Sequence, residues 1–120
     1  MSEIKKSKEE TIFMKIIRKE IPADIVYEDA LFMCFRDVNP VAPLHLLMVP
    51  KKPVAKLSDT TEGRHTLILG HMMLWAPKIV KEQGYDDFRI VLNNGAGAGQ
   101  TVFHLHIHII AGRSLQWPPG

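Results

Sequence analysis

The sequence predicts an α+β domain in which a five-stranded antiparallel meander sheet is accompanied by two helices. Short apolar runs of strand-like character are joined by turn residues, which favours antiparallel neighbours. Two other stretches have the apolar spacing of helices, and these are grouped along the chain rather than alternating with each strand. A chain of 120 residues, 46% of them hydrophobic, is long enough for one such domain with a modest core.

The first predicted helix lies near the N-terminus. Ser7 and Glu10 have the spacing of a capping box, and the apolar residues that follow recur at helical intervals as far as Lys19. Pro22 ends this helix, because its ring cannot be accommodated in a helix interior. Three strands are predicted next, over residues 24–28, 31–36 and 44–50.

A long helix is predicted from Thr60 to Gln83, with Gly84 as its C-terminal cap. Its two histidines, His65 and His71, are expected at exposed or interface positions. The chain then returns to the sheet with the runs FRIVLNN and FHLHIHIIA, which are separated by the loop GAGAGQT. At least one edge of such a sheet is left unpaired, and pairing with a second copy of the chain is one way of covering it.

The composition excludes several classes of function. A net charge of +2 is too small to indicate nucleic-acid binding, and the basic residues near the N-terminus are mixed with acidic ones. No apolar run has the length of a membrane span or of a signal-peptide core, so we predict a soluble cytoplasmic protein, with the nucleus as a second location. We predict that residues 1–10 are a flexible charged tail and that residues 11–120 form the single domain. Cys34 lies in an apolar strand and is expected to be a buried, unreactive thiol.

Three histidines occupy every second position of the last predicted strand. His104, His106 and His108 alternate with apolar residues, which places the imidazoles on one face of the strand and the apolar side chains on the other. A structural role, a metal site and imidazole catalysis are all compatible with this spacing. Zinc suits two histidines at this interval, but the outer two are roughly 13 Å apart along a strand. In the catalytic alternative the middle histidine is the nucleophile, and its far nitrogen must be protonated and hydrogen-bonded.

A glycine-rich loop precedes the histidines. Gly95, Gly97 and Gly99 allow backbone N–H groups to turn toward an anion, and Gln100 and Thr101 add side-chain donors. The loop joins two strands, whereas a dinucleotide fingerprint requires a strand, a glycine loop and a helix. A phosphate site and a plain flexible hairpin are therefore both compatible with this pattern.

The motif HLHIHII resembles the signature of the histidine triad superfamily. The resemblance extends over nearly the whole chain and is to the Hint branch, the histidine triad nucleotide-binding proteins, through the segments IFMKIIRKEIPADIVYED, DVNPVAPLHLLMVPKK, NNGAGAGQTVFHLHIHIIAGR and the terminal WPPG. It implies a homodimer in which two five-stranded sheets join into ten strands. It also implies a purine nucleotide site on each protomer, with no metal and no other cofactor.

The resemblance assigns catalytic roles to four histidines. His106 is implied as the nucleophile that takes the nucleotidyl group, and His108 as its neighbour that contacts the α-phosphate and assists the leaving group. His104 and His45 are implied to support the orientation of the nucleophile through hydrogen bonds.

The resemblance also implies which residues hold the nucleotide. The ribose is expected to meet Asp37 and Asn39. The phosphate side is expected to be lined by Asn93, Gly99, Gln100, Thr101 and Val102. The purine pocket is expected to be formed or bordered by Phe13, Ile16, Ile21, Phe35 and Leu47. Trp117 is expected to reach the site of the partner protomer.

The implied reaction is hydrolysis of the P–N bond of a purine nucleoside phosphoramidate through a nucleotidyl-histidine intermediate. Two alternatives come from other classes of protein: a purine mononucleotide-binding sensor or scaffold with little turnover, and a zinc-binding protein. The sequence departs from the family pattern at Arg36, where the well-known members carry histidine, and at Asn94, where an acidic residue is usual. We expect altered contacts near the base from Arg36 and a less negative phosphate loop from Asn94.

Overall fold

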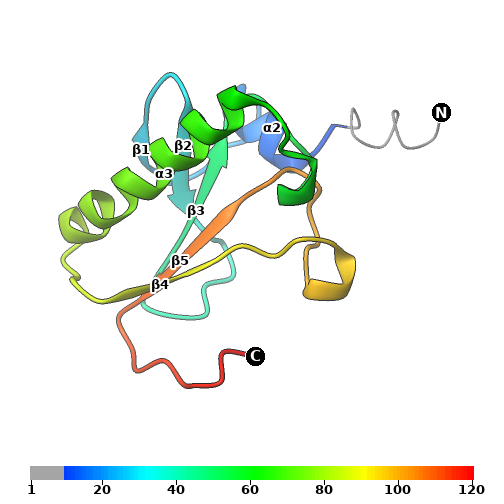
Figure 1. The fold of residues 1–120 in the computed structure, drawn as a ribbon. Helices are drawn as coiled ribbons and strands as arrows, with labels where there is room; N and C mark the ends of the chain where they lie inside the picture. The colour runs from blue at the N-terminus through cyan, green and yellow to red at the C-terminus, as the bar shows by residue number, and fades with distance from the viewer. Residues whose placement is uncertain (1–9) are drawn as a thin grey trace.

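The fold is built on one antiparallel sheet (Figure 1). A computed structural model describes residues 10–120 of the chain. The strands are β1 (Ile25–Glu28), β2 (Phe32–Arg36), β3 (Leu44–Pro50), β4 (Phe88–Val91) and β5 (Ile107–Ala111). Their order in the sheet is β1-β2-β3-β5-β4, and every neighbouring pair is antiparallel. The predicted five-stranded antiparallel sheet is confirmed. The order is not that of a simple meander, because β5 inserts between β3 and β4.

The first helix, α2 (Ile12–Ile17), is shorter than predicted. It is capped by Thr11, whose hydroxyl accepts a hydrogen bond from the backbone N–H of Met14. Lys19 ends it, because a backbone φ of 62° is incompatible with a continuing right-handed helix. The capping box predicted at Ser7 and most of the predicted N-terminal tail lie outside the described residues.

The long helix, α3 (Gly63–Glu82), lies along one face of the sheet (Figure 1). It begins three residues later than predicted, because Glu62 is its N-cap and has an extended backbone, and a separate 3-10 turn, η1 (Leu57–Asp59), precedes it. It ends as predicted, since Gly84 has a φ of 93° and leaves the helix in the left-handed region. The two helices complete the α+β fold. Within residues 10–120 no helix, α3 included, is long and apolar enough to cross a membrane.

Each face of the sheet carries an apolar cluster. The cluster under α3 contains inward residues of β2, β3 and β5, and Cys34 is fully buried within it. Burial raises the pKa of the Cys34 thiol to about 12, so the predicted unreactive thiol is confirmed as a buried one. The opposite cluster contains Phe13 and Ile16 of α2, packed on Phe35 and Leu47. The short helix α2 therefore packs on the second face of the sheet.

Candidate active site

The histidine row does not lie on one regular strand. β5 begins at Ile107, so His108 alone of the three histidines belongs to it, and the prediction of a strand from residue 103 is wrong. The backbone N–H of Leu105 donates to the carbonyl oxygen of Val54, 2.7 Å away in the loop after β3. The backbone of this segment is thus paired with that loop at Leu105 and not with a neighbouring strand.

The two faces of the row are nevertheless separated as predicted. The rings of His104 and His106 contact Phe13 edge-on, with centroid distances of 5.9 Å and 5.0 Å. Ile107 and Ile109 are buried in the other cluster, under α3. The imidazoles therefore share the face of the sheet that α2 covers.

His106 is held in a single tautomer. Its Nδ1 lies 2.8 Å from the carbonyl oxygen of His104, and a carbonyl can only accept a hydrogen bond. Nδ1 consequently carries the proton, and Nε2 keeps a free lone pair. Burial lowers the pKa of His106 below its usual value, which favours the neutral ring. This is the form that a nucleophilic histidine requires.

His104 supports His106 through its backbone rather than through its ring. The imidazole of His104 is fully buried, and its Nε2 donates to the carbonyl oxygen of Pro50 at 2.8 Å. Its Nδ1 has no hydrogen-bond partner among residues 10–120. The ring thus fastens the segment to the end of β3, and the carbonyl group of the same residue orients the neighbouring histidine.

His108 is held in the opposite tautomer, with its proton on Nε2 instead of Nδ1. The backbone N–H of Val41 donates to Nδ1 of His45 at 3.2 Å, so the proton of a neutral His45 must be on Nε2. That Nε2 lies 2.9 Å from Nδ1 of His108, which must therefore accept. The remaining nitrogen of His108, Nε2, carries the proton. His45 thus contacts His108 rather than His106, which corrects the role that the resemblance implied.

The two neighbouring rings present complementary groups. Their centroids are 5.0 Å apart, and His106 offers a lone pair where His108 offers an N–H. Burial, followed by the nearby His106 and His45, lowers the pKa of His108 to about 4, so its ring is neutral at neutral pH. One ring can attack an electrophile while the other donates a hydrogen bond to it.

A carboxylate completes this cluster. Oδ2 of Asp37 lies 3.4 Å from Nε2 of His45, and the ligand atoms of Asp37, His45 and His108 are all within 4.8 Å of one another. This spacing alone suits a zinc ion. The protonation states do not, because a metal ligand needs a free lone pair, and Nε2 of His45 carries a proton as long as Val41 donates to Nδ1. The residues as placed do not fit a metal.

The apolar residues expected around a purine are brought together. They form one cluster beside His106, with Phe13 in contact with its ring. The cluster contains Phe13, Ile16, Ile21, Phe35, Leu47 and Val102. Arg36 does not reach it, because alternation along β2 turns its side chain to the other face, where it bonds to Gln83 and pairs with Asp24. The expected change in contacts near the base is therefore not found.

Gln100 braces the glycine loop from inside. Its side chain is buried, and its Nε2 donates to the carbonyl oxygens of Ala55 and Val102 at 2.7 Å and 3.0 Å. Its Oε1 accepts from the backbone N–H of Gly95 at 2.8 Å. Both side-chain protons are thus used within the protein, and the expectation that Gln100 offers a donor to phosphate is corrected. The loop itself bends at Gly95 and Gly99, whose φ values are 93° and 97°.

The other residues expected around the phosphate and ribose have few contacts with the histidines or the apolar cluster among the hydrogen bonds of the described residues. Thr101 is exposed, and Nδ2 of Asn93 lies beside Gly99. The backbone N–H of Asn39 donates to Oδ1 of Asp37 at 2.8 Å. Asn94 accepts from the backbone N–H of Ser58 at 2.8 Å, a role that the usual acidic residue would also fill.

Trp117 is 81% exposed and has no aromatic contact within residues 10–120.

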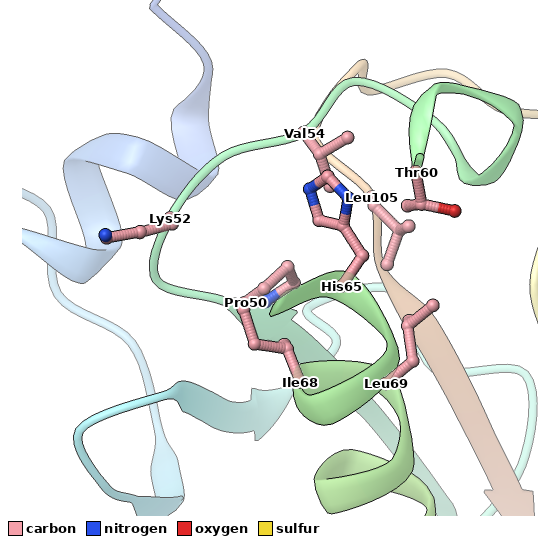
Figure 2. A pocket seen from close by; sticks show the side chains of 8 residues that line it. All are labelled: Pro50, Lys52, Val54, Thr60, His65, Ile68, Leu69 and Leu105. Atoms are coloured by element: carbon pink, nitrogen blue, oxygen red, sulfur yellow. The ribbon is translucent and has the colours of Figure 1, made fainter. Parts of the chain in front are cut away.

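A separate hollow lies at the start of α3, and the side chain of His65 is part of its lining. Figure 2 shows its ring between Val54 and Leu105, and Nδ1 of His65 accepts from the backbone N–H groups of Thr61 and Glu62. This histidine is a buried helix cap rather than an exposed residue. His71 is half-buried and lies 2.7 Å from Asp29. The long helix thus uses both histidines for structure.

A family model described as the HIT domain matches residues 18–115. The chain belongs to the HIT domain family. An uncharacterized HIT-like protein of Synechocystis sp. is 58% identical over 113 residues, which cover 93% of this chain and 98% of that protein. A 14 kDa zinc-binding protein of Zea mays is 46% identical over 112 residues, which cover 92% of this chain and 88% of that protein.

Solved structures of the HIT family have the same fold. The crystal structure of a HIT family hydrolase from Legionella pneumophila has a TM-score of 0.87 and 39% identity, and covers 92% of this chain and 100% of that chain. A histidine triad protein from Clostridium difficile has a TM-score of 0.82 and 46% identity, covering 88% and 92% of the two chains. The HIT domain match includes all four histidines of the site, while Phe13 and Trp117 lie outside it.

Two residues of the site could not be found from the sequence. Val41 acts through its backbone N–H and Arg113 through a hydrogen bond to the carbonyl oxygen of Val41. A backbone amide leaves no signal in a motif, because every residue except proline carries one.

Proposed function

We propose that the chain is a purine nucleoside phosphoramidase of the Hint branch, which hydrolyses P–N bonds through a nucleotidyl-histidine. The observation that carries the proposal is the pair of neighbouring rings with opposite polarity. His106 presents a lone pair and His108 an N–H, with their centroids 5.0 Å apart. Membership of the HIT family, and the hydrolase named among its structural neighbours, support the same class of reaction.

The surroundings of the pair suit a nucleotide. The apolar cluster around Phe13 and Phe35, which lies beside the ring of His106, is the proposed contact surface for a purine. Asp37 and Asn39 are the proposed ribose contacts. Thr101, Val102 and Asn93 are the proposed phosphate contacts, with Gly99 allowing close approach of the backbone. Gln100 holds this loop in shape before the substrate arrives, so the donors need little rearrangement in the transition state.

The reaction proceeds in two displacements. Nε2 of His106 attacks phosphorus, a bond from phosphorus to that nitrogen forms, and the bond to the amine breaks as the amine takes up a proton. His108 donates a hydrogen bond to a non-bridging oxygen, where negative charge develops. Water then attacks phosphorus and releases His106 and the nucleoside monophosphate. A proton from this water replaces the one that the amine carried away.

The proposal is tested by mass spectrometry of the intact chain, mixed briefly with adenosine 5'-phosphoramidate and quenched. We expect an adduct of one nucleotidyl group on the peptide that contains His106. A matched sample of His106→Asn should remain unmodified. Consumption of substrate without any adduct on the native chain, even at the shortest times, would contradict the covalent route. Tight nucleotide binding without consumption would favour the sensor or scaffold alternative.

The zinc alternative has one observation in its favour, the close approach of Asp37, His45 and His108. A relative from Zea mays is also named a zinc-binding protein. The proton on Nε2 of His45 opposes this alternative for the chain described here. We therefore propose a reaction that needs neither a metal nor another cofactor.

We also propose a homodimer in the cytoplasm, whose sheets join into ten strands. β4 is an edge strand of the sheet, and α3 exposes Leu67, Met73 and Leu74, with 67%, 48% and 62% of their surfaces accessible. An unpaired sheet edge and exposed apolar residues on a helix each favour association. Light scattering during gel filtration should give twice the mass of the chain, and Leu74→Glu should shift this mass toward the monomer.

A further inference from the structure

Three hydrogen bonds in series lead from the C-terminal segment to His108. Nε of Arg113 donates to the carbonyl oxygen of Val41 at 2.9 Å. The backbone N–H of Val41 donates to Nδ1 of His45 at 3.2 Å. Nε2 of His45 donates to Nδ1 of His108 at 2.9 Å. Arg113 follows β5 by two residues, and its hydrogen bonds go to backbone carbonyl groups rather than to either histidine.

The direction of the series is set by the backbone N–H of Val41. A peptide N–H cannot give up its proton at neutral pH, so it acts on His45 as a donor only. If His45 instead carried a proton on Nδ1, two N–H groups would face each other. Each following proton is therefore placed in turn, first on Nε2 of His45 and then on Nε2 of His108.

Arg113 holds the residue whose N–H sets this direction, by donating to its carbonyl oxygen. Val41 lies in the loop between β2 and β3 and is 54% exposed, so packing alone does little to fix it. A guanidinium group that donates to the carbonyl oxygen of Val41 anchors the backbone of this residue, and the position of its N–H opposite His45 is thereby restrained. Nη1 of Arg113 also donates to the carbonyl oxygen of Ser114 at 3.1 Å, which fastens the same side chain to the start of the C-terminal segment.

We propose that Arg113 is a positioning residue that fixes His108 as an Nε2–H donor through the backbone of Val41 and the ring of His45. The position of Arg113 in the C-terminal segment thereby affects which nitrogen of His108 carries the proton, although Arg113 donates no hydrogen bond to His108 itself. This inference rests on the proposed function where it assigns His108 a contact with the phosphate. The assignment of its proton does not depend on the reaction.

The series also limits what His108 does in the reaction. Loss of the Nε2 proton would turn the neutral ring of His108 into an imidazolate, and a proton passed on by His45 would only move the negative charge to His45, because the series begins at a peptide N–H that keeps its own proton. His108 therefore acts as a hydrogen-bond donor to the phosphate and not as the acid that protonates the amine. The amine takes its proton from another source, such as water. This conclusion sharpens the assisting role that the resemblance implied.

The first test is the tautomer itself, measured by NMR of the full chain with ¹⁵N-labelled histidine at pH 7. We expect the nitrogen signals of His108 to report a proton on Nε2 and none on Nδ1. In Arg113→Met, which keeps the length of the side chain and removes its donors, we expect the His108 signals to shift toward a mixture of tautomers. Arg113→Lys retains one donor and should restore the native pattern. Arg64→Met, a change of an exposed arginine on α3, is the matched control and should leave the pattern unchanged.

Turnover provides a second readout. Loss of one charged hydrogen bond should lower kcat of Arg113→Met by about three- to tenfold, with KM within about twofold of the native value. His45→Gln can still donate to His108, whereas His45→Glu can only accept, so the second should lose at least about tenfold more turnover than the first. A His108 proton on Nδ1 in the native chain, or native signals and turnover in Arg113→Met, would overturn the proposal. If the tautomer shifts as expected but the native chain hydrolyses no phosphoramidate, the proposed function fails and the coupling stands.

Discussion

Two histidine–carboxylate pairs lie in different parts of the molecule and differ in how completely they are satisfied. Asp29 and His71 join the turn after β1 to α3, with Oδ2 of Asp29 2.7 Å from Nε2 of His71 and 2.8 Å from the hydroxyl of Tyr27. Oδ1 of Asp29 accepts from the backbone N–H groups of Leu31 and Phe32 at 2.8 Å and 3.0 Å. This carboxylate has four donors, which matches its capacity.

The pair formed by Asp37 and His45 is left open. Asp37 accepts from one backbone N–H and lies 3.4 Å from His45, and the series of hydrogen bonds continues to His108. It ends there on an N–H that has no acceptor among residues 10–120. A saturated pair stabilises the fold, whereas an open series presents a group to a substrate. The same residue types therefore serve structure in one place and chemistry in the other.

The largest expected effect separates the two regions by turnover. His106→Asn should lower kcat about a thousandfold or more, because it removes the attacking nitrogen. Its affinity for adenosine monophosphate should stay within about tenfold, since most contacts come from elsewhere. His71→Asn, a matched change in the saturated pair, should leave kcat within about twofold at 25 °C. Steady-state kinetics and calorimetry measure both quantities, and near-native turnover in His106→Asn would move the nucleophile to another residue.

Stability should show the reverse order. Asp29→Asn loses the charge that four donors face, and should lower the free energy of unfolding by about 2 kcal/mol. Asp37→Asn, the matched change in the open pair, should lower it by less than about 1 kcal/mol while reducing turnover. Denaturant unfolding at pH 7 gives both values. Equal losses of stability in the two variants would show that saturation does not distinguish the pairs.

Acid should weaken the contribution of Asp29. Burial alone would raise its pKa, but the hydrogen bonds from His71, Leu31, Phe32 and Tyr27 outweigh burial and lower the pKa to about 2. A carboxyl whose pKa is lower in the folded state stabilises the protein above its unfolded pKa, and this stabilisation disappears as the pH falls through the folded value. The difference in unfolding free energy between native chain and Asp29→Asn should therefore shrink between pH 4 and pH 2. A constant difference over that interval would refute the assignment.

The open region should respond to pH in its activity instead. Burial lowers the pKa of His106 below 6.5, so the ring remains neutral, and nucleophilic, at pH values where an exposed histidine is half protonated. We expect kcat/KM to change by less than about twofold between pH 7.5 and 6.5 and to fall only at lower pH. A profile of kcat/KM against pH measures this. A midpoint at or above 6.5 would show that the nucleophile is not shielded from water.

The smallest expected effect on turnover is that of removing metal ions. Although Asp37, His45 and His108 have zinc-like spacing, His45 carries its proton on the nitrogen that would bind the ion. Exhaustive chelation should leave turnover unchanged, and elemental analysis of the purified protein should find no stoichiometric zinc. Activity that disappears with chelator and returns with zinc would assign the open pair to a metal and not to hydrogen bonding.

Much of the fold follows from local patterns in the sequence. The alternation around Ile107 and Ile109 predicts their burial under α3, and Gly84 predicts the end of that helix. The extent of the strand at His104 was not predictable in this way. A local period reports which face a side chain occupies, whereas strand pairing depends on a partner distant in the chain, and here the loop at Val54 takes the place of that partner.

The candidate site divides along the same line. The sequence alone determined which imidazoles and apolar side chains can form the site, because sequence motifs identify residues such as His106, His108 and Phe13 by their side chains. Only the tertiary structure decided their protonation, since that depends on the carbonyl group of His104 and the N–H of Val41. Peptide groups are the same in every residue, and what distinguishes them is the place that folding gives them. The lone pair on one ring and the N–H on its neighbour are therefore properties of the fold.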